Sequence, residues 1–108
     1  MPLILAIDFD SVLHDWEHPV PGRKMGPPIE GAKDALIRLK AQGYTVIIWS
    51  CNRPQIIRDW MLWWGLPFDS IWGERPSDVG KPAASCYIDN NAIRFENWAQ
   101  TLDALTNA

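Results

Sequence analysis

Four short apolar runs divide the chain. They cover Leu3–Phe9, Tyr44–Trp49, Phe68–Trp72 and Ala84–Ile88. The first run is almost continuously apolar, and the second is rich in β-branched and aromatic side chains, which favour strands. Continuous apolar runs of this length are typical of strands that are buried on both faces of a parallel sheet. The pattern therefore predicts four strands that belong to one parallel sheet.

Between and after these runs, apolar residues recur at the spacing of three to four residues that is typical of helices packed on one side. We predict helices over Ile29–Gln42, Pro54–Trp64 and Arg94–Leu105. Gly43 and Gly65 directly follow the first two stretches, and glycine is the residue that most often ends a helix. The three predicted helices alternate with the predicted strands.

This alternation predicts an α/β fold, a Rossmann-like three-layer α/β/α sandwich with a short parallel sheet and helices on both of its faces. Two polar stretches rich in Pro and Gly, Ser11–Pro28 and Gly73–Ala83, are predicted to be loops, and Asn90–Ala92 is predicted to be a turn. No repeat or low-complexity linker interrupts the chain. We therefore expect one domain over residues 1–108, with a flap loop over about residues 11–28.

Composition narrows the functional classes. The chain has 108 residues, 47% of them hydrophobic, and a formal net charge of -3. These values exclude a disordered chain and argue against a nucleic-acid binder that relies on bulk positive charge. No apolar run approaches the length of a membrane span, and no signal peptide is recognisable. We expect a cytoplasmic protein whose two cysteines, Cys51 and Cys86, are reduced thiols.

Acidic residues follow two of the predicted strands. In open α/β sheets the functional site lies at the carboxyl ends of the strands. Asp8 and Asp10 are two positions apart and point to the same side in extended backbone, so their charges repel unless a cation lies between them. Asp89 supplies a third acid at another strand end. Mg²⁺ is the natural partner of such carboxylates, although solvated loop acids are the ordinary interpretation of each motif by itself.

A second group of residues suits an anion. Ser50 ends a strand and precedes a helix, where a hydroxyl and backbone N–H groups can hold phosphate. Cys51 and Asn52 follow it directly and are candidate substrate-binding residues. Lys81 lies in the loop before the last strand and would neutralise phosphate charge. Taken singly, Ser50 is an ordinary helix-entry residue and Lys81 a solvated surface lysine.

Together and in this order, the motifs resemble those of the haloacid dehalogenase-like phosphohydrolase superfamily. The matching segments are Ile7-Asp8-Phe9-Asp10-Ser11-Val12, Val46-Ile47-Ile48-Trp49-Ser50, Lys81 and Tyr87-Ile88-Asp89. The resemblance spans about residues 3–95. It implies a Mg²⁺-dependent phosphatase that hydrolyses a phosphomonoester.

The resemblance also implies a role for each matching residue. Asp8 would attack phosphorus to form an aspartyl-phosphate, and Asp10 would act as general acid and then general base. Ser50 and Lys81 would hold the phosphoryl oxygens. Mg²⁺ would bind the Asp8 side chain, the Asp10 backbone carbonyl and Asp89.

The chain departs from the family pattern at the fourth motif. The family offers a second acid directly after the first or a few residues later, where this chain has Asn90, Asn91 and Ile93. Fewer negative ligands weaken binding of Mg²⁺. The alternative function is therefore a weakly active or inactive relative that binds a phosphate ligand or a protein partner.

Neither insertion point of the family holds a cap domain in this chain, because both stretches are short. An open site favours a bulky or macromolecular phosphorylated substrate, with nucleic acid only as a substrate end. The chain has seven Trp residues. Trp60, Trp63 and Trp64 cannot all face one core, and with Trp72 they define a candidate surface for a homodimer or another partner.

Overall fold

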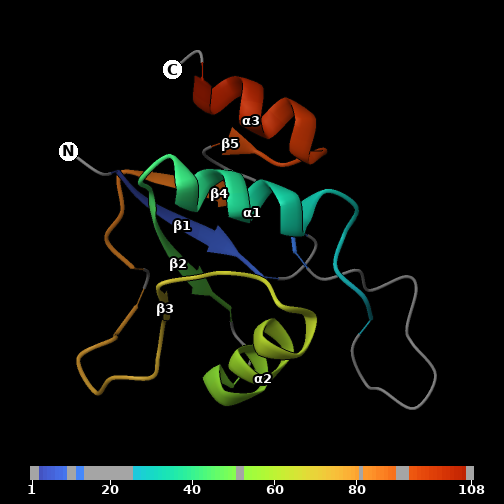
Figure 1. Ribbon diagram of the computed structural model, residues 1–108. Helices are drawn as coiled ribbons and strands as arrows, with labels where there is room; N and C mark the ends of the chain where they lie inside the picture. Colours follow the sequence, from blue (N-terminus) through green and yellow to red (C-terminus); the bar gives the residue numbers. More distant parts are fainter. Residues whose placement is uncertain are drawn as a thin grey trace.

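The computed structural model describes residues 3–9, 12–13, 26–50, 53–80, 82–89 and 93–106. In this part of the chain, helices and strands alternate along the sequence (Figure 1). The elements are β1 (Ile4–Asp8), α1 (Ala32–Ala41), β2 (Thr45–Trp49), α2 (Pro54–Trp64), β3 (Ser70–Ile71), β4 (Cys86–Asp89), β5 (Ile93–Arg94) and α3 (Trp98–Thr106). The predicted α/β class is confirmed.

The strands form one parallel sheet in the order β3-β2-β1-β4-β5. β1 lies at its centre and is paired on both sides. Its partners are in register from Ile4↔Thr45 to Asp8↔Trp49 on β2, and from Leu5↔Cys86 to Ile7↔Ile88 on β4. The first strand of the chain therefore fixes the positions of its two neighbours.

One face of the sheet carries the hydrophobic core, and we call it the helix face. Alternate residues of neighbouring strands point to this face. Leu5, Ile7, Val46, Ile48 and Ile88 are all fully buried there. All three helices contribute side chains to the same core cluster, among them Leu36, Met61 and Trp98. Each fully buried aliphatic side chain stabilises the fold by about 1.5–3 kcal/mol.

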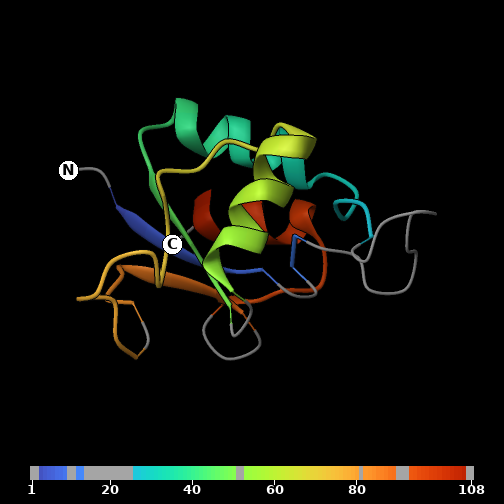
Figure 2. The ribbon, with the colours of Figure 1, turned by 90° about the horizontal axis from the view of Figure 1, so that it is seen from below.

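The handedness of strand connections explains why α1 and α2 share this face. The steps from β1 to β2 and from β2 to β3 run in the same direction across the sheet. A right-handed crossover then places both connecting helices on the same side. Figure 2 shows the described helices on one side of the sheet and the segment between β3 and β4 on the other.

That segment lies on the opposite face because the step from β3 to β4 runs back across β2 and β1. We call this the loop face; it carries Ile4, Ala6, Asp8, Ile47 and Tyr87. Residues 72–80 and 82–85, which the structure describes, contain no helix. The prediction of helices on both faces is therefore wrong for the described chain, since a loop forms the layer where a helix was expected.

Some predicted boundaries also differ. α3 begins at Trp98 instead of Arg94, because Ile93 and Arg94 form β5 and pair with Ile88 and Asp89. α1 begins at Ala32, since Gly31 before it has a φ of 85°, which is outside the helical region. The bounds of α2 agree with the prediction.

The Trp residues of α2 divide between core and surface, as their spacing predicts. The Trp60 side chain is only 6% exposed, whereas that of Trp63 is 64% exposed. The Trp60 ring meets Phe9 edge-on at 4.9 Å, and its Nε1 donates to the Gly26 carbonyl at 2.9 Å. Trp60 thus links α2 to the central strand and to the chain before α1.

Candidate functional site

Three of the predicted site residues lie at the carboxyl edge of the sheet. Asp8 is the last residue of β1 and is half-buried. Its register partner on β2 is Trp49, so the half-buried Ser50 lies one position beyond that partner. Adjacent strands are about 4.8 Å apart. Asp8 and Ser50 therefore begin neighbouring loops at the same edge.

Asp89 lies on the other side of Asp8. It is the last residue of β4. Ile7 of β1 is in register with Ile88 of β4, and Asp8 and Asp89 directly follow these two residues. The order of strands reverses between β1 and β4, and ligands of open α/β sheets bind at such a reversal. The two acidic residues thus flank the point of the fold where a ligand site is expected.

The chain after β1 is held by several hydrogen bonds. The Phe9 N–H donates to the Trp49 carbonyl at 3.0 Å, which extends the pairing of β1 and β2. The Leu13 N–H then donates to the Phe9 carbonyl at 3.0 Å, and the Trp98 Nε1 donates to the Val12 carbonyl at 3.2 Å. Val12 and Leu13 are buried in the core. These contacts fix the backbone on both sides of residues 10–11.

The amino end of α2 faces the same edge. Pro54 occupies the first helical turn, and Arg53 precedes it in extended conformation without a side-chain hydrogen bond that caps the helix. The first turn contains no acidic residue. Pro54 has no N–H, and the N–H groups of Ile56 and Ile57 donate to the Arg53 carbonyl at 3.1 and 3.3 Å. What this helix start contributes is therefore the partial positive charge of the helix dipole. Such a helix start, next to Ser50, favours an anionic group.

Four predicted site residues, namely Asp10, Cys51, Asn52 and Lys81, lie outside the described residues, and for Asp89 only the backbone is described. Both neighbours of Lys81 are anchored, however. The Gly80 carbonyl accepts a hydrogen bond from Trp72 Nε1 at 2.8 Å, and the Pro82 carbonyl accepts one from the Tyr87 hydroxyl at 2.6 Å. The loop that carries Lys81 is therefore tied to β4 and to the end of β3.

A metal ion at this edge would have to be held by residues at the strand ends. Among the described side chains, no group of three or more His, Cys, Asp or Glu residues gathers in one place. Asp8 and Asp89 nevertheless place two acidic residues at adjoining strand ends, and carboxylate oxygen is the donor that hard divalent cations prefer. The donor set that the chain offers here fits Mg²⁺. Cys86 is a half-buried free thiol.

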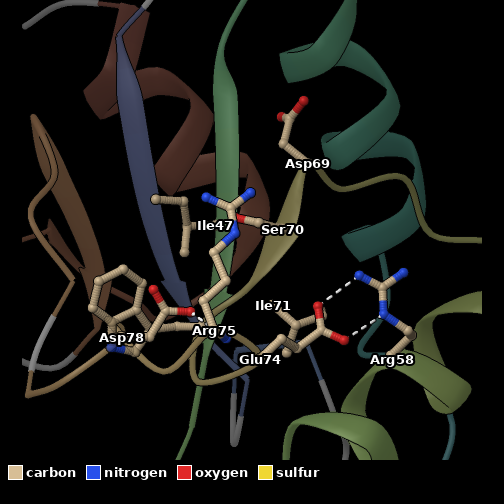
Figure 3. A pocket seen from close by; sticks show the side chains of 9 residues that line it. Ile47, Arg58, Asp69, Ser70, Ile71, Glu74, Arg75 and Asp78 are labelled. Carbon is tan, nitrogen blue, oxygen red and sulfur yellow. Dashed lines mark hydrogen bonds and ion pairs between the residues drawn. The ribbon is translucent and has the colours of Figure 1, made fainter.

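The structure also shows a pocket that the sequence pattern did not predict (Figure 3). It has a volume of about 340 Å³ and lies between the loop face and the segment after β3. Its side walls include an ion pair, in which Arg58 Nε and one terminal nitrogen each bond a carboxylate oxygen of Glu74 at 2.6 Å. The hydrogen bond from Arg58 lowers the pKa of Glu74, and the same bond raises the pKa of Arg58.

No signal in the sequence could have identified this pocket. Arg58 lies on α2 and Glu74 in the loop after β3, so the two residues meet only because the chain folds back at the edge of the sheet. Arg75 also lines the pocket, and it is exposed. Its neighbours become apparent only from the tertiary structure.

The comparisons with known proteins bear on the fold alone. No family model and no curated protein matches the chain. A solved structure, that of a conserved protein coded by a locus from Bacteroides thetaiotaomicron, is similar with a TM-score of 0.76 and 20% sequence identity. The similarity covers 99% of this chain and 92% of the other. The chain thus shares its α/β fold with this protein over almost its whole length.

In the described residues, no helix has the length and apolar character needed to cross a membrane.

Proposed function

We propose that this protein is a Mg²⁺-dependent phosphatase that hydrolyses a phosphomonoester through an aspartyl-phosphate on Asp8. The observation that carries the proposal is the placement of Ser50, Asp8 and Asp89 on three neighbouring strands, in the order β2-β1-β4. This edge includes the point where the strand order reverses. The amino end of α2 adds a partial positive charge next to Ser50.

The proposed reaction has two displacements at phosphorus. A carboxylate oxygen of Asp8 forms a bond to phosphorus while the bond to the ester oxygen breaks, and Asp10 gives that oxygen a proton. Asp10 then removes a proton from water, whose oxygen attacks phosphorus and releases Asp8 and inorganic phosphate. Mg²⁺, when bound by Asp8, Asp89 and the Asp10 carbonyl, would supply charge neutralisation.

Holding the phosphoryl group is the other task of the site. Ser50 and Lys81 would hold its oxygens, while Cys51 and Asn52 would contact the substrate. Phosphoryl transfer depends on in-line positioning and on neutralising charge. The strand ends provide the positioning, because Asp8 and Ser50 are fixed by the pairing of β1 and β2.

The test is hydrolysis of an aryl phosphate by the full chain with Mg²⁺. Asp8→Asn keeps the size of the side chain and removes the nucleophile, so we expect turnover to fall by at least about a thousandfold. Asp59→Asn is the matched control. Asp59 is exposed on α2, and its Oδ1 accepts a bond from Gln55 that an asparagine oxygen can also accept. Full activity is expected in this control, and chelation of Mg²⁺ should abolish turnover.

Two results would overturn the proposal. One is turnover that persists in Asp8→Asn, which would place the chemistry elsewhere. The other is absence of turnover over a broad panel of phosphoesters. If the folded chain bound phosphate without turnover, the alternative of a phosphate-binding or partner-binding module would replace the enzyme. Asn90 and Asn91 of the fourth motif favour that alternative.

A further inference from the structure

The pocket between the loop face and the segment after β3 has the size of a small-molecule site and a mainly polar lining. Its volume of about 340 Å³ is at the lower end of the range for such sites. Ile47 and Trp72 supply apolar surface. Figure 3 shows the Arg75 side chain extending across β2, with its guanidinium between Ile47 and Ser70.

Two of the three carboxylates that line the pocket are neutralised by cations. The Asp69 carboxylate forms an ion pair with Lys40 and accepts a hydrogen bond from the Val46 N–H at 2.7 Å. The Glu74 carboxylate accepts hydrogen bonds from Nε and one terminal nitrogen of Arg58. Neither carboxylate needs a ligand, and neither leaves a net charge in the pocket.

The third carboxylate, that of Asp78, bonds to backbone instead. It accepts hydrogen bonds from the N–H groups of Gly73 and Arg75, both at 3.1 Å, which closes the turn from which Arg75 projects. The guanidinium of Arg75 has no ion pair or hydrogen bond with another described residue. The same holds for the hydroxyl of the half-buried Ser70. Two donors in the pocket are therefore available to a ligand.

Charge and shape together select the class of ligand. A guanidinium fork matches the two oxygens of a carboxylate. The two ion pairs cancel, and the charges of Arg75 and Asp78 cancel as well, so the formal charge around the pocket is zero. The Asp78 carboxylate is bonded to backbone N–H groups, which leaves the Arg75 guanidinium as the cation that can bind an anion. A monoanion suits this single cation better than a phosphate dianion. The indole of Trp72 and the side chain of Ile47 suit one flat apolar ring.

We propose that this pocket binds a small aromatic monocarboxylate, with Arg75 and Ser70 holding the carboxylate and Trp72 contacting the ring. This site is separate from the strand ends that carry Asp8, so binding does not depend on phosphatase activity. The two proposals can therefore fail independently.

The test measures binding of benzoate to the full chain by calorimetry or ligand-observed NMR. We expect saturable binding at one site per chain. Arg75→Gln, an exposed substitution that should leave the fold intact, is expected to weaken binding at least tenfold. Arg38→Gln removes an exposed arginine of α1 and is the matched control, with unchanged affinity expected. Asp8→Asn should also bind benzoate as the unaltered chain does.

Four results would overturn the proposal. They are no saturable binding of benzoate, equal affinity in Arg75→Gln and the unaltered chain, equal affinity for benzyl alcohol, and tighter Arg75-dependent binding of inorganic phosphate. The third would show that the carboxylate is not recognised. The fourth would show that the pocket prefers a multiply charged anion.

Discussion

Replacing Trp60 by phenylalanine tests how strongly α2 is held to the rest of the molecule. The substitution removes the Nε1 donor from the Gly26 carbonyl, a bond in the protein interior. Removing a donor from a buried carbonyl costs about 1–3 kcal/mol. The ring centroids of Phe9 and Trp64 lie 4.9 and 6.5 Å from that of Trp60, so the smaller ring leaves space beside them. This space lowers the free energy of unfolding by about 1 kcal/mol more. We expect a total loss of about 2–4 kcal/mol.

Urea unfolding followed by circular dichroism measures this loss. With a denaturant slope of about 1.5 kcal/mol per M, the midpoint should fall by about 1.3–2.7 M. Trp63→Phe is the same chemical change on the same helix at a side chain that is 64% exposed, and it should alter stability by less than about 0.5 kcal/mol. Equal midpoint shifts for the two variants would refute the reasoning, since the burial of Trp60 and its bond to Gly26 would then contribute nothing to the free energy of unfolding.

Three further predictions concern other parts of the fold. Thr101 is 1% exposed and its Oγ1 has no hydrogen-bond partner among the described residues, so Thr101→Val should raise the free energy of unfolding by about 1 kcal/mol in urea titrations. Glu74→Gln should destabilise the chain more at pH 7 than in acid, because the bond from Arg58 lowers the pKa of Glu74. Its contribution is fully present above the unfolded pKa, near 4.5, and is lost as pH falls through the lower folded pKa. Equal losses of unfolding free energy at pH 7 and in acid would contradict the role of Arg58. Gly73→Ala should lower the temperature of thermal unfolding more than Gly43→Ala does. Both glycines have positive φ, but only at Gly73 would the new Cβ lie 2.9 Å from a proline ring. A larger decrease for Gly43→Ala would be inconsistent with this contact.

Sequence patterns predicted the elements that carry their own signals. Pro54 at the start and Gly65 after the end fixed the bounds of α2, and the β-branched run identified β2 to within one residue. β5 has only two residues and is defined by its pairing with β4, so no local pattern marks it. A strand of this kind becomes visible only when its partner is known.

The candidate site was predictable where it depends on strand ends. Asp8, Ser50 and Asp89 follow apolar runs, and the parallel sheet brings such ends to one edge. The pocket around Arg75 was not predictable, because its walls come from α2, β2, β3 and the following loop. The loop layer was missed for a related reason: alternation of elements predicts crossovers, but not whether each crossover contains a helix.

The central position of β1 has a consequence for how the molecule is assembled. The hydrogen bond from the Ile4 N–H to the Ser85 Oγ joins residues 81 positions apart, whereas β1 and β2 meet across half that distance in sequence. Closing a longer loop costs more entropy and slows pairing, so β4 should join the sheet after β1, β2 and β3 have paired. During synthesis, the edge of β1 that faces β4 stays open until β4 itself has emerged. We therefore expect Asp8 and Asp89 to come together late in folding, so that activity at this edge would require β4 to have joined the sheet.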